Sequence, residues 1–338
     1  MSGIFLYEVR EDKKDGHRFV EITGYDGKVA DLVVPEFIRI EQLGVAGGDL
    51  PVEAIGNHAF SGRQDIETVS LPKTIRTLYG FTFHNCRNLR KITLFDSIDD
   101  YYDGVCRQCD SLTEIEITMT RGWFEVIRNF LSDNDKTLRF RIHMPGDGEP
   151  SAAEDAGQLR DGDDSGKSAT ALLTFPEYVY DFAENTMART IQFSIAGSGM
   201  FYRECVDRRK IDYRGYDKLF EKGRIDGGEI AEDIAIGRLL FPVELDDGYR
   251  CQYEEYLHEH GASVLRRRVT GWDAGFACGE ILKKLLAYRC GSAMSLFSAD
   301  AIDDAIRLSS DMGLTEVTAI LMEYSSAHTS LAPQRFEF

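Results

Sequence analysis

Two cysteines, Cys106 and Cys109, have the C-x-x-C spacing found in zinc sites and dithiol redox centres. A structural zinc ion needs four ligands, and the sequence has no second C-x-x-C pair to complete such a site. Cys109 also follows Cys86 by 23 residues, the period of a repeat described below. His258 and His260 would point about 200° apart on a helix and could not share one ion. We therefore interpret these cysteines as packing residues and predict no metal site.

Two further motifs lack part of what their chemistry requires. Asp161, Asp163 and Ser165 imitate the start of a calcium-binding EF-hand loop. The position that should hold a bidentate glutamate is Leu172, which cannot bind calcium. Gly166-Lys167-Ser168 imitates the end of a phosphate-binding P-loop, but Asp161 stands where the leading glycine should be. We expect no cofactor.

The segment from Phe175 to Cys205 is the least repetitive part of the chain and mixes several kinds of reactive side chain. A cysteine nucleophile there would need a histidine close in space, which a sequence does not reveal. A ligand-binding or enzymatic activity in residues 172–245 is therefore one alternative. Its candidate pocket residues are Glu177, Asn185, Arg189, Tyr202, Arg203 and Cys205.

The composition limits the classes of partner. With 338 residues the chain is long enough for two domains. Its 57 acidic and 39 basic residues give a net charge of −18, which repels nucleic acid and anionic membranes. The first 20 residues contain no apolar stretch typical of a signal peptide, and we find no membrane span. An odd number of cysteines, seven, indicates free thiols. We expect a cytoplasmic protein, or a secreted one if a leader was removed.

A repeat of 23 residues begins near Ile55 and includes Cys86, Cys106 and Cys109. Each unit is too small to bury its own apolar residues, so units of this kind stack and share one core. Every residue in the repeat columns is apolar or a cysteine. The clearest columns are Phe60, Phe83 and Cys106; Ile66, Leu89 and Leu112; Val69, Ile92, Ile115 and Leu138; and Leu71, Leu94, Ile117 and Phe140.

The last two columns alternate with polar residues, which predicts one short strand per unit and a parallel sheet across the units. The polar residues between them would face outward from the sheet in two rows. The first predicted row is Thr68, Lys91, Glu114 and Thr137, and the second is Ser70, Thr93, Glu116 and Arg139.

The repeat resembles the BspA-like leucine-rich repeats. The residues that carry the resemblance are IGNHAFSGRQDIETVSLP (Ile55 to Pro72) and LYGFTFHNCRNLRKITL (Leu78 to Leu94). The segment from Phe19 to Ile38 looks like the hairpin cap that precedes such arrays, so the resemblance covers about residues 5–145. Arg63 departs from the pattern because the family has cysteine there, and Thr120 to Leu131 looks helical, as a C-terminal cap would. The resemblance implies a solenoid that binds proteins through its sheet; many members of the family are secreted or surface adhesins.

The rest of the chain divides into an acidic linker and a mainly helical domain. Residues 146–170 hold seven acidic and two basic residues and no aromatic residue, which predicts a flexible connector. Residues 171–338 would form the helical domain. Within it, an offset of 36 residues relates Leu285-Leu286 to Leu321-Met322, and Gly313 to Tyr324 resembles the second helix of an ankyrin repeat. We expect ankyrin-like helix pairs at about 260–326.

Together these observations predict an α+β multidomain protein, with a leucine-rich repeat solenoid in residues 1–145 followed by the helical domain. The predicted function is a non-catalytic protein–protein interaction module or scaffold that is not an enzyme. A protein partner is expected, but its identity and the oligomeric state do not follow from the sequence. The alternatives are the pocket in residues 172–245 and a secreted or surface adhesin, which would contain disulfides.

Overall fold

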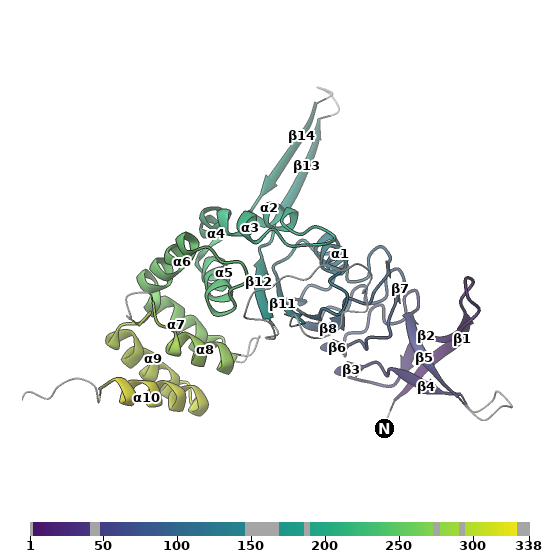
Figure 1. Cartoon of the computed structure of the whole chain (residues 1–338), viewed down its shortest axis with the longest axis horizontal. Helices are drawn as coiled ribbons and strands as arrows, with labels where there is room; N and C mark the ends of the chain where they lie inside the picture. Colours follow the sequence, from purple (N-terminus) through teal and green to yellow (C-terminus); the bar gives the residue numbers. More distant parts are fainter. Residues whose placement is uncertain are drawn as a thin grey trace, which may run out of the picture. The chain divides into compact units, whose positions relative to one another are not determined.

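A computed structural model describes residues 3–40, 48–145, 169–185, 190–272, 278–290 and 295–329. The chain divides into two compact units, Met1–Lys222 and Gly223–Phe338 (Figure 1). The first unit contains a β-solenoid of about four turns, and the chain continues into a helical region, as the sequence predicted. Among the described residues, no helix is both long enough and apolar enough to cross a membrane.

Two sheets, called sheet A and sheet B here, form the walls of the solenoid. Sheet A has the order β1 (Ile4–Glu11), β2 (Arg18–Asp26), β5 (Asp49–Ile55), β7 (Thr77–Leu78) and β9 (Asp100–Tyr101), and β4 (Phe37–Arg39) pairs with β5. Sheet B has the order β12 (Ala169–Phe175), β11 (Leu138–Met144), β10 (Glu114–Thr118), β8 (Lys91–Phe95), β6 (Thr68–Ser70) and β3 (Asp31–Val33). The strands from β3 to β11 in sheet B are parallel, because each turn of the chain advances the sheet by one strand.

The predicted repeat columns form the core between the sheets. Phe60 and Phe83 stack with their ring centroids 5.5 Å apart, and both are buried. The loops also repeat in their backbone conformation, because residues 23 apart adopt the same positive φ angle. One such set is His58, Phe81 and Gly104, and another is Gly62, Asn85 and Gln108.

The cysteines of the repeat are core residues, as predicted. Cys86 and Cys109 are buried, and each thiol donates a hydrogen bond to a carbonyl of the preceding turn: Cys86 Sγ to Phe60 O at 3.1 Å and Cys109 Sγ to Phe83 O at 3.0 Å. Arg63 occupies the equivalent position in the first unit. It donates to the carbonyls of Tyr25 and Gly27 at 2.8 and 2.7 Å, so a longer donor reaches from the first repeat to the hairpin that precedes it.

The structure extends the first unit beyond the boundary that the sequence suggested at residue 171. β12 pairs antiparallel with β11 and is therefore the last strand of sheet B. Residues 146–168, most of the predicted linker, lie outside the described residues. The unit continues through the hairpin of β13 (Val179–Asn185) and β14 (Thr190–Ala196), α2 (Gly199–Glu204) and α3 (Tyr213–Lys218). Periodicity could not place β12 in the sheet, because an antiparallel strand added after a long insertion does not share the repeat.

At the edge of sheet B, one side chain binds both backbone groups of a residue of β12. The Tyr216 hydroxyl donates to Thr174 O at 2.6 Å and accepts from Thr174 N at 3.0 Å. Both backbone groups of Thr174 would otherwise face outward from the edge strand. This contact ends the sheet and ties α3 to it.

The second unit consists of helices that stack in pairs. Its described helices are α5 (Gly228–Leu240), α6 (Asp247–Glu259), α7 (Gly261–Thr270), α8 (Cys278–Ala287), α9 (Ala299–Asp311) and α10 (Thr315–Thr329), and α4 (Phe220–Asp226) spans the division between the units. α9 packs on both α7 and α10, and α8 packs on α5 and α10. Whether this stacking is of the ankyrin type stays a prediction.

Helix α5 lies inside the second unit, because every residue from Ala231 to Leu239 is buried. Its two buried carboxylates, Glu232 and Asp233, bind the guanidinium groups of Arg267 and Arg268 on α7. Buried charges need such partners because they have lost their hydration. The arginine cluster at 266–268 therefore contributes to packing through two of its three members.

Candidate functional site

The outer face of sheet B carries most of the predicted partner-binding residues. The strand register places Thr68, Lys91 and Glu114 side by side in one row, and Ser70, Thr93 and Glu116 in the next. These two rows agree with the sequence prediction for three turns of the solenoid. The six side chains are half-buried, so they form a continuous but shallow polar surface.

The predicted rows are wrong at the fourth turn. The register between β10 and β11 pairs Glu114 with Arg139 and Glu116 with Arg141, so Arg139 belongs to the first row and not the second. Thr137 precedes the strand, and its hydroxyl accepts a hydrogen bond from Glu177 N. The physical reason is α1 (Glu125–Asp133), which replaces the loop of this turn and lengthens the spacing between paired residues from 23 to 25.

A network of charged side chains crosses three strands of this face. Glu116 on β10 bonds to Lys91 Nζ on β8 at 2.6 Å and to His143 Nε2 on β11 at 2.8 Å. Burial acts to raise the pKa of Glu116, but the hydrogen bonds from Lys91 and His143 outweigh it, and the net shift is downward. Glu116 is therefore a carboxylate held between the side chains of Lys91 and His143.

The face also contains residues that the sequence prediction missed. Asp31 and Val33 on β3 extend the two rows at the N-terminal end, and Thr68 donates a hydrogen bond to Asp31 at 2.7 Å. Val33 is 64% exposed. Arg141 and His143 extend the face at the other end. Asp31 and Val33 flank the buried Leu32, so their alternation was a signal for a strand before the recognised repeats.

The four candidate pocket residues whose side chains the structure describes, Glu177, Tyr202, Arg203 and Cys205, do not line a common pocket. Glu177 is exposed, whereas Tyr202 is fully buried against Tyr216 with the ring centroids 4.7 Å apart. Burial raises the pKa of the Cys205 thiol to about 11, which opposes formation of a nucleophilic thiolate. Arg189 and the side chain of Asn185 lie outside the described residues. A cavity of about 290 Å³ nearby is lined by Tyr178 and by residues of 107–110 and 132–136, and by none of the four candidates with described side chains.

Arg203 holds several backbone segments together through its guanidinium group. Its guanidinium is stacked over the Tyr178 ring at 4.8 Å and lies among backbone carbonyls. Burial lowers its pKa to about 10, although Tyr178 and Asp135 act in the opposite direction. It donates to the carbonyl oxygens of Leu131, Asn134, Lys136, Pro176 and Gly199. Arg203 thus joins the end of α1 to the segments before and within α2.

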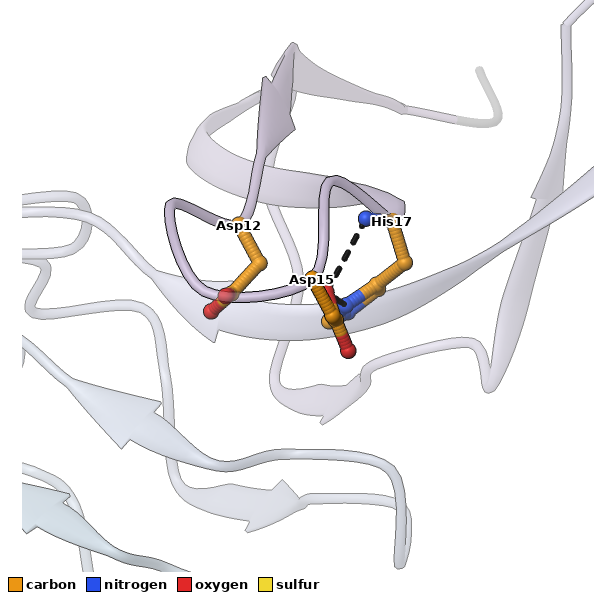
Figure 2. Close-up of side chains that lie close together, drawn as sticks. All are labelled: Asp12, Asp15 and His17. Carbon is orange, nitrogen blue, oxygen red and sulfur yellow. Dashed lines mark hydrogen bonds and ion pairs between the residues drawn. The ribbon is translucent and has the colours of Figure 1, made fainter.

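A cluster on the β1–β2 turn has the composition of a metal site. Asp12, Asp15 and His17 bring ligand atoms within 4.8 Å of one another (Figure 2). His17 Nδ1 is 2.7 Å from Asp15, and Nε2 is 2.8 Å from Glu53 on β5. The hydrogen bonds to Glu53 and Asp15 raise the pKa of His17 to about 9. Near neutral pH both ring nitrogens are then protonated, so a metal ion would have to displace a proton from the ring. Without a metal the cluster is an ionic link between the turn and β5.

Comparisons with known proteins agree with the repeat. Residues 49–131 match the BspA type leucine rich repeat region, with six copies of the family pattern, which confirms the predicted resemblance for this segment. No curated protein matches the chain.

Solved structures similar to part of the chain include two bacterial leucine-rich repeat proteins. One is a leucine rich cell surface protein from Faecalibacterium prausnitzii, with 20% identity and a TM-score of 0.27; the match covers 34% of this chain and 31% of that one. The other is a leucine-rich repeat protein from Bacteroides capillosus, with 21% identity, a TM-score of 0.29 and coverage of 35% and 83%. The chain therefore spans less than a third of the length of the first of these proteins.

Replacing Arg203 with lysine tests the structural role of this residue. A lysine has three donors on one nitrogen and cannot reach five carbonyls, so we expect the free energy of unfolding of the first unit to fall by about 2 kcal/mol. The matched control is Arg208→Lys, since Arg208 is 62% exposed and binds Glu125. Urea denaturation measures both variants. Equal stability of wild type and Arg203→Lys would contradict the assignment.

The His17 link predicts a pH dependence. Because the pKa of His17 is raised in the folded chain, its contribution to stability is complete below about pH 6.5 and is lost as the pH rises through about 9. The melting temperature of wild type should therefore exceed that of His17→Gln at pH 6, and the difference should shrink by pH 10. A difference that grows with pH, or an NMR titration of His17 with its midpoint below 7, would rule out the protonated link.

Proposed function

We propose that the protein is a non-catalytic interaction module that binds a protein partner through the outer face of sheet B. The observation that carries the proposal is the two rows of outward-facing residues from β3 to β11, in which parallel pairing places the residues of neighbouring strands side by side. The face contains both acidic and basic groups around Glu116. Such a surface suits a protein with complementary charges better than a polyanion.

The outer face of sheet B is exposed at its β3 end and buried over most of its β11–β12 end. Val33 provides an exposed apolar position at the β3 end, whereas Arg141, Leu172 and Thr174 at the β11–β12 end are buried. The surface open to a partner therefore covers the strands β3, β6, β8 and β10 together with the half-buried Arg139 and His143 on β11. A face of four short strands favours a compact epitope over an extended one.

We also propose that the protein binds its partner in the cytoplasm. None of the seven cysteines forms a disulfide, and the thiols of Cys86 and Cys109 donate to carbonyls of neighbouring turns. Burial raises the pKa of Cys86 to about 12, so it stays a thiol. This use of cysteine suits a reducing compartment. A surface location like that named for the Faecalibacterium protein is the alternative.

Reversing the charge of the face tests the proposal. The double variant Glu114→Lys/Glu116→Lys should reduce recovery of the partner in affinity purification at least tenfold. The two new lysines repel basic groups of the partner that the two carboxylates would attract, and Lys91 no longer has Glu116 as its ion-pair partner. The matched control is Asp26→Lys/Asp100→Lys, which changes the net charge equally at exposed positions of sheet A. Quantitative mass spectrometry of both purifications gives the readout.

The comparison of the two double variants also shows which results would contradict the proposal. Proteins that are lost with both double variants reflect net charge alone. If every protein recovered with wild type is recovered equally with the sheet B variant, and circular dichroism shows that this variant is folded, the outer face of sheet B is not the binding surface.

A further inference from the structure

The hairpin of β13 and β14 is a separate two-stranded sheet in the first unit. It extends away from the neighbouring strands β11 and β12 (Figure 1). Within the described residues each of its strands pairs with the other strand alone, so each has an outer edge. Val179, Tyr180 and Ile195, near its base, are 56%, 51% and 45% exposed. A two-stranded hairpin is marginally stable in water and gains stability from additional strands.

The register divides the hairpin into an apolar and a polar face. Residues directly opposite each other share a face, and successive residues alternate between faces. The pairing runs without a bulge from Val179–Ala196 to Asn185–Thr190. One face therefore contains the positions of Tyr180, Phe182, Ile191, Phe193 and Ile195 together with Glu184. The other contains the positions of Asp181, Asn185, Thr190, Gln192 and Ser194 together with Val179, Ala183 and Ala196.

The two edges differ in charge. β13 contains Asp181 and Glu184, and charges of this kind discourage an edge strand from pairing with another copy. β14 has the sequence Thr-Ile-Gln-Phe-Ser-Ile-Ala, with no charged residue, no proline and no glycine. Uncharged seven-residue segments rich in β-branched and aromatic residues are those that pair with strands of other chains.

The sequence of β14 is also symmetric about its centre. Phe193 is flanked by two polar residues, Gln192 and Ser194, and these by two isoleucines, Ile191 and Ile195. In an antiparallel pair of two β14 strands centred on Phe193, each of the five central residues faces one of its own kind. Phe193 lies opposite Phe193, each Ile191 opposite an Ile195, and each Gln192 opposite a Ser194.

From this symmetry we propose that β14 pairs with β14 of a second copy of the chain and forms a dimer. The two hairpins then make one four-stranded sheet in the order β13, β14, β14, β13, with the positions of Tyr180, Phe182, Ile191, Phe193 and Ile195 on one face and the charged β13 strands at the outer edges. A two-fold axis through Phe193 relates the copies, as a self-complementary interface requires. This interface is distinct from the outer face of sheet B, so the two proposals stand or fall separately.

Net charge sets how this dimer responds to salt. Two copies that each carry −18 repel one another, and salt screens that repulsion. The dimer should therefore strengthen as ionic strength rises, opposite to an interface held by ion pairs.

Sedimentation equilibrium of the full chain at a series of concentrations tests the proposal. The variant Gln192→Lys/Ser194→Lys places like charges opposite each other in both polar cross-strand pairs, so the dimer dissociation constant should rise about tenfold or more. The matched control is Asp181→Asn/Ala183→Lys, which changes net charge equally on the same face but on β13. This control should dimerise like wild type. A monomer at every concentration and salt, or a dimer that both double variants leave intact, overturns the proposal.

Cysteine cross-linking gives a second test that does not depend on affinity. In a Cys251→Ser background, which removes the exposed native thiol, Phe193→Cys should form a covalent dimer on mild oxidation, because position 193 lies opposite itself. Ile195→Cys should not, since position 195 lies opposite 191. Equal cross-linking of the two variants, or none with Phe193→Cys, contradicts the register.

Discussion

The solenoid depends on one constraint, which is that the backbone groups inside each loop find their hydrogen-bond partners in the next turn. The N–H groups of Phe60 and Gly62 donate to the carbonyls of Thr82 and His84, and Phe83 repeats this one turn later with Val105. Buried peptide groups without partners would cost about 1–3 kcal/mol each. The loops can therefore be buried only if successive turns stay in register, and the sheets follow from that register.

Each end of the array must replace the partners that a further turn would supply. At the N-terminal end Arg63 donates to the preceding hairpin, in the position that Cys86 and Cys109 hold in later turns. At the C-terminal end the Asp133 carboxylate on α1 accepts from Tyr101 Oη and from the N–H groups of Gly104 and Cys106. One charged side chain at each end thus satisfies groups that a repeat would otherwise satisfy.

The same constraint explains what the sequence could predict. Columns of identical spacing revealed the core, the strands and the outward rows from Thr68 to Glu116, because these positions repeat. In the fourth turn α1 replaces the loop, and the spacing between paired residues is two residues longer than the repeat. Arg139 therefore lies in the first row and not in the predicted second row, and the repeat did not reveal Arg141 and His143. The pairing of β12 with β11 and the contacts of Arg203 both join segments that are far apart in the sequence by hydrogen bonds to backbone groups. Such contacts leave no periodic signal and were first seen in the structure.

Hydrogen exchange of the loop amides tests the central claim that each turn is held by the next. The amides of Phe60, Gly62, Phe83 and Asn85 lie in loops, yet each donates to a carbonyl of the following turn. The account predicts that they exchange as slowly as the amides of β8 and β10 in native-state NMR measurements. Exchange at the rate of exposed loops, with only the strands protected, would contradict it.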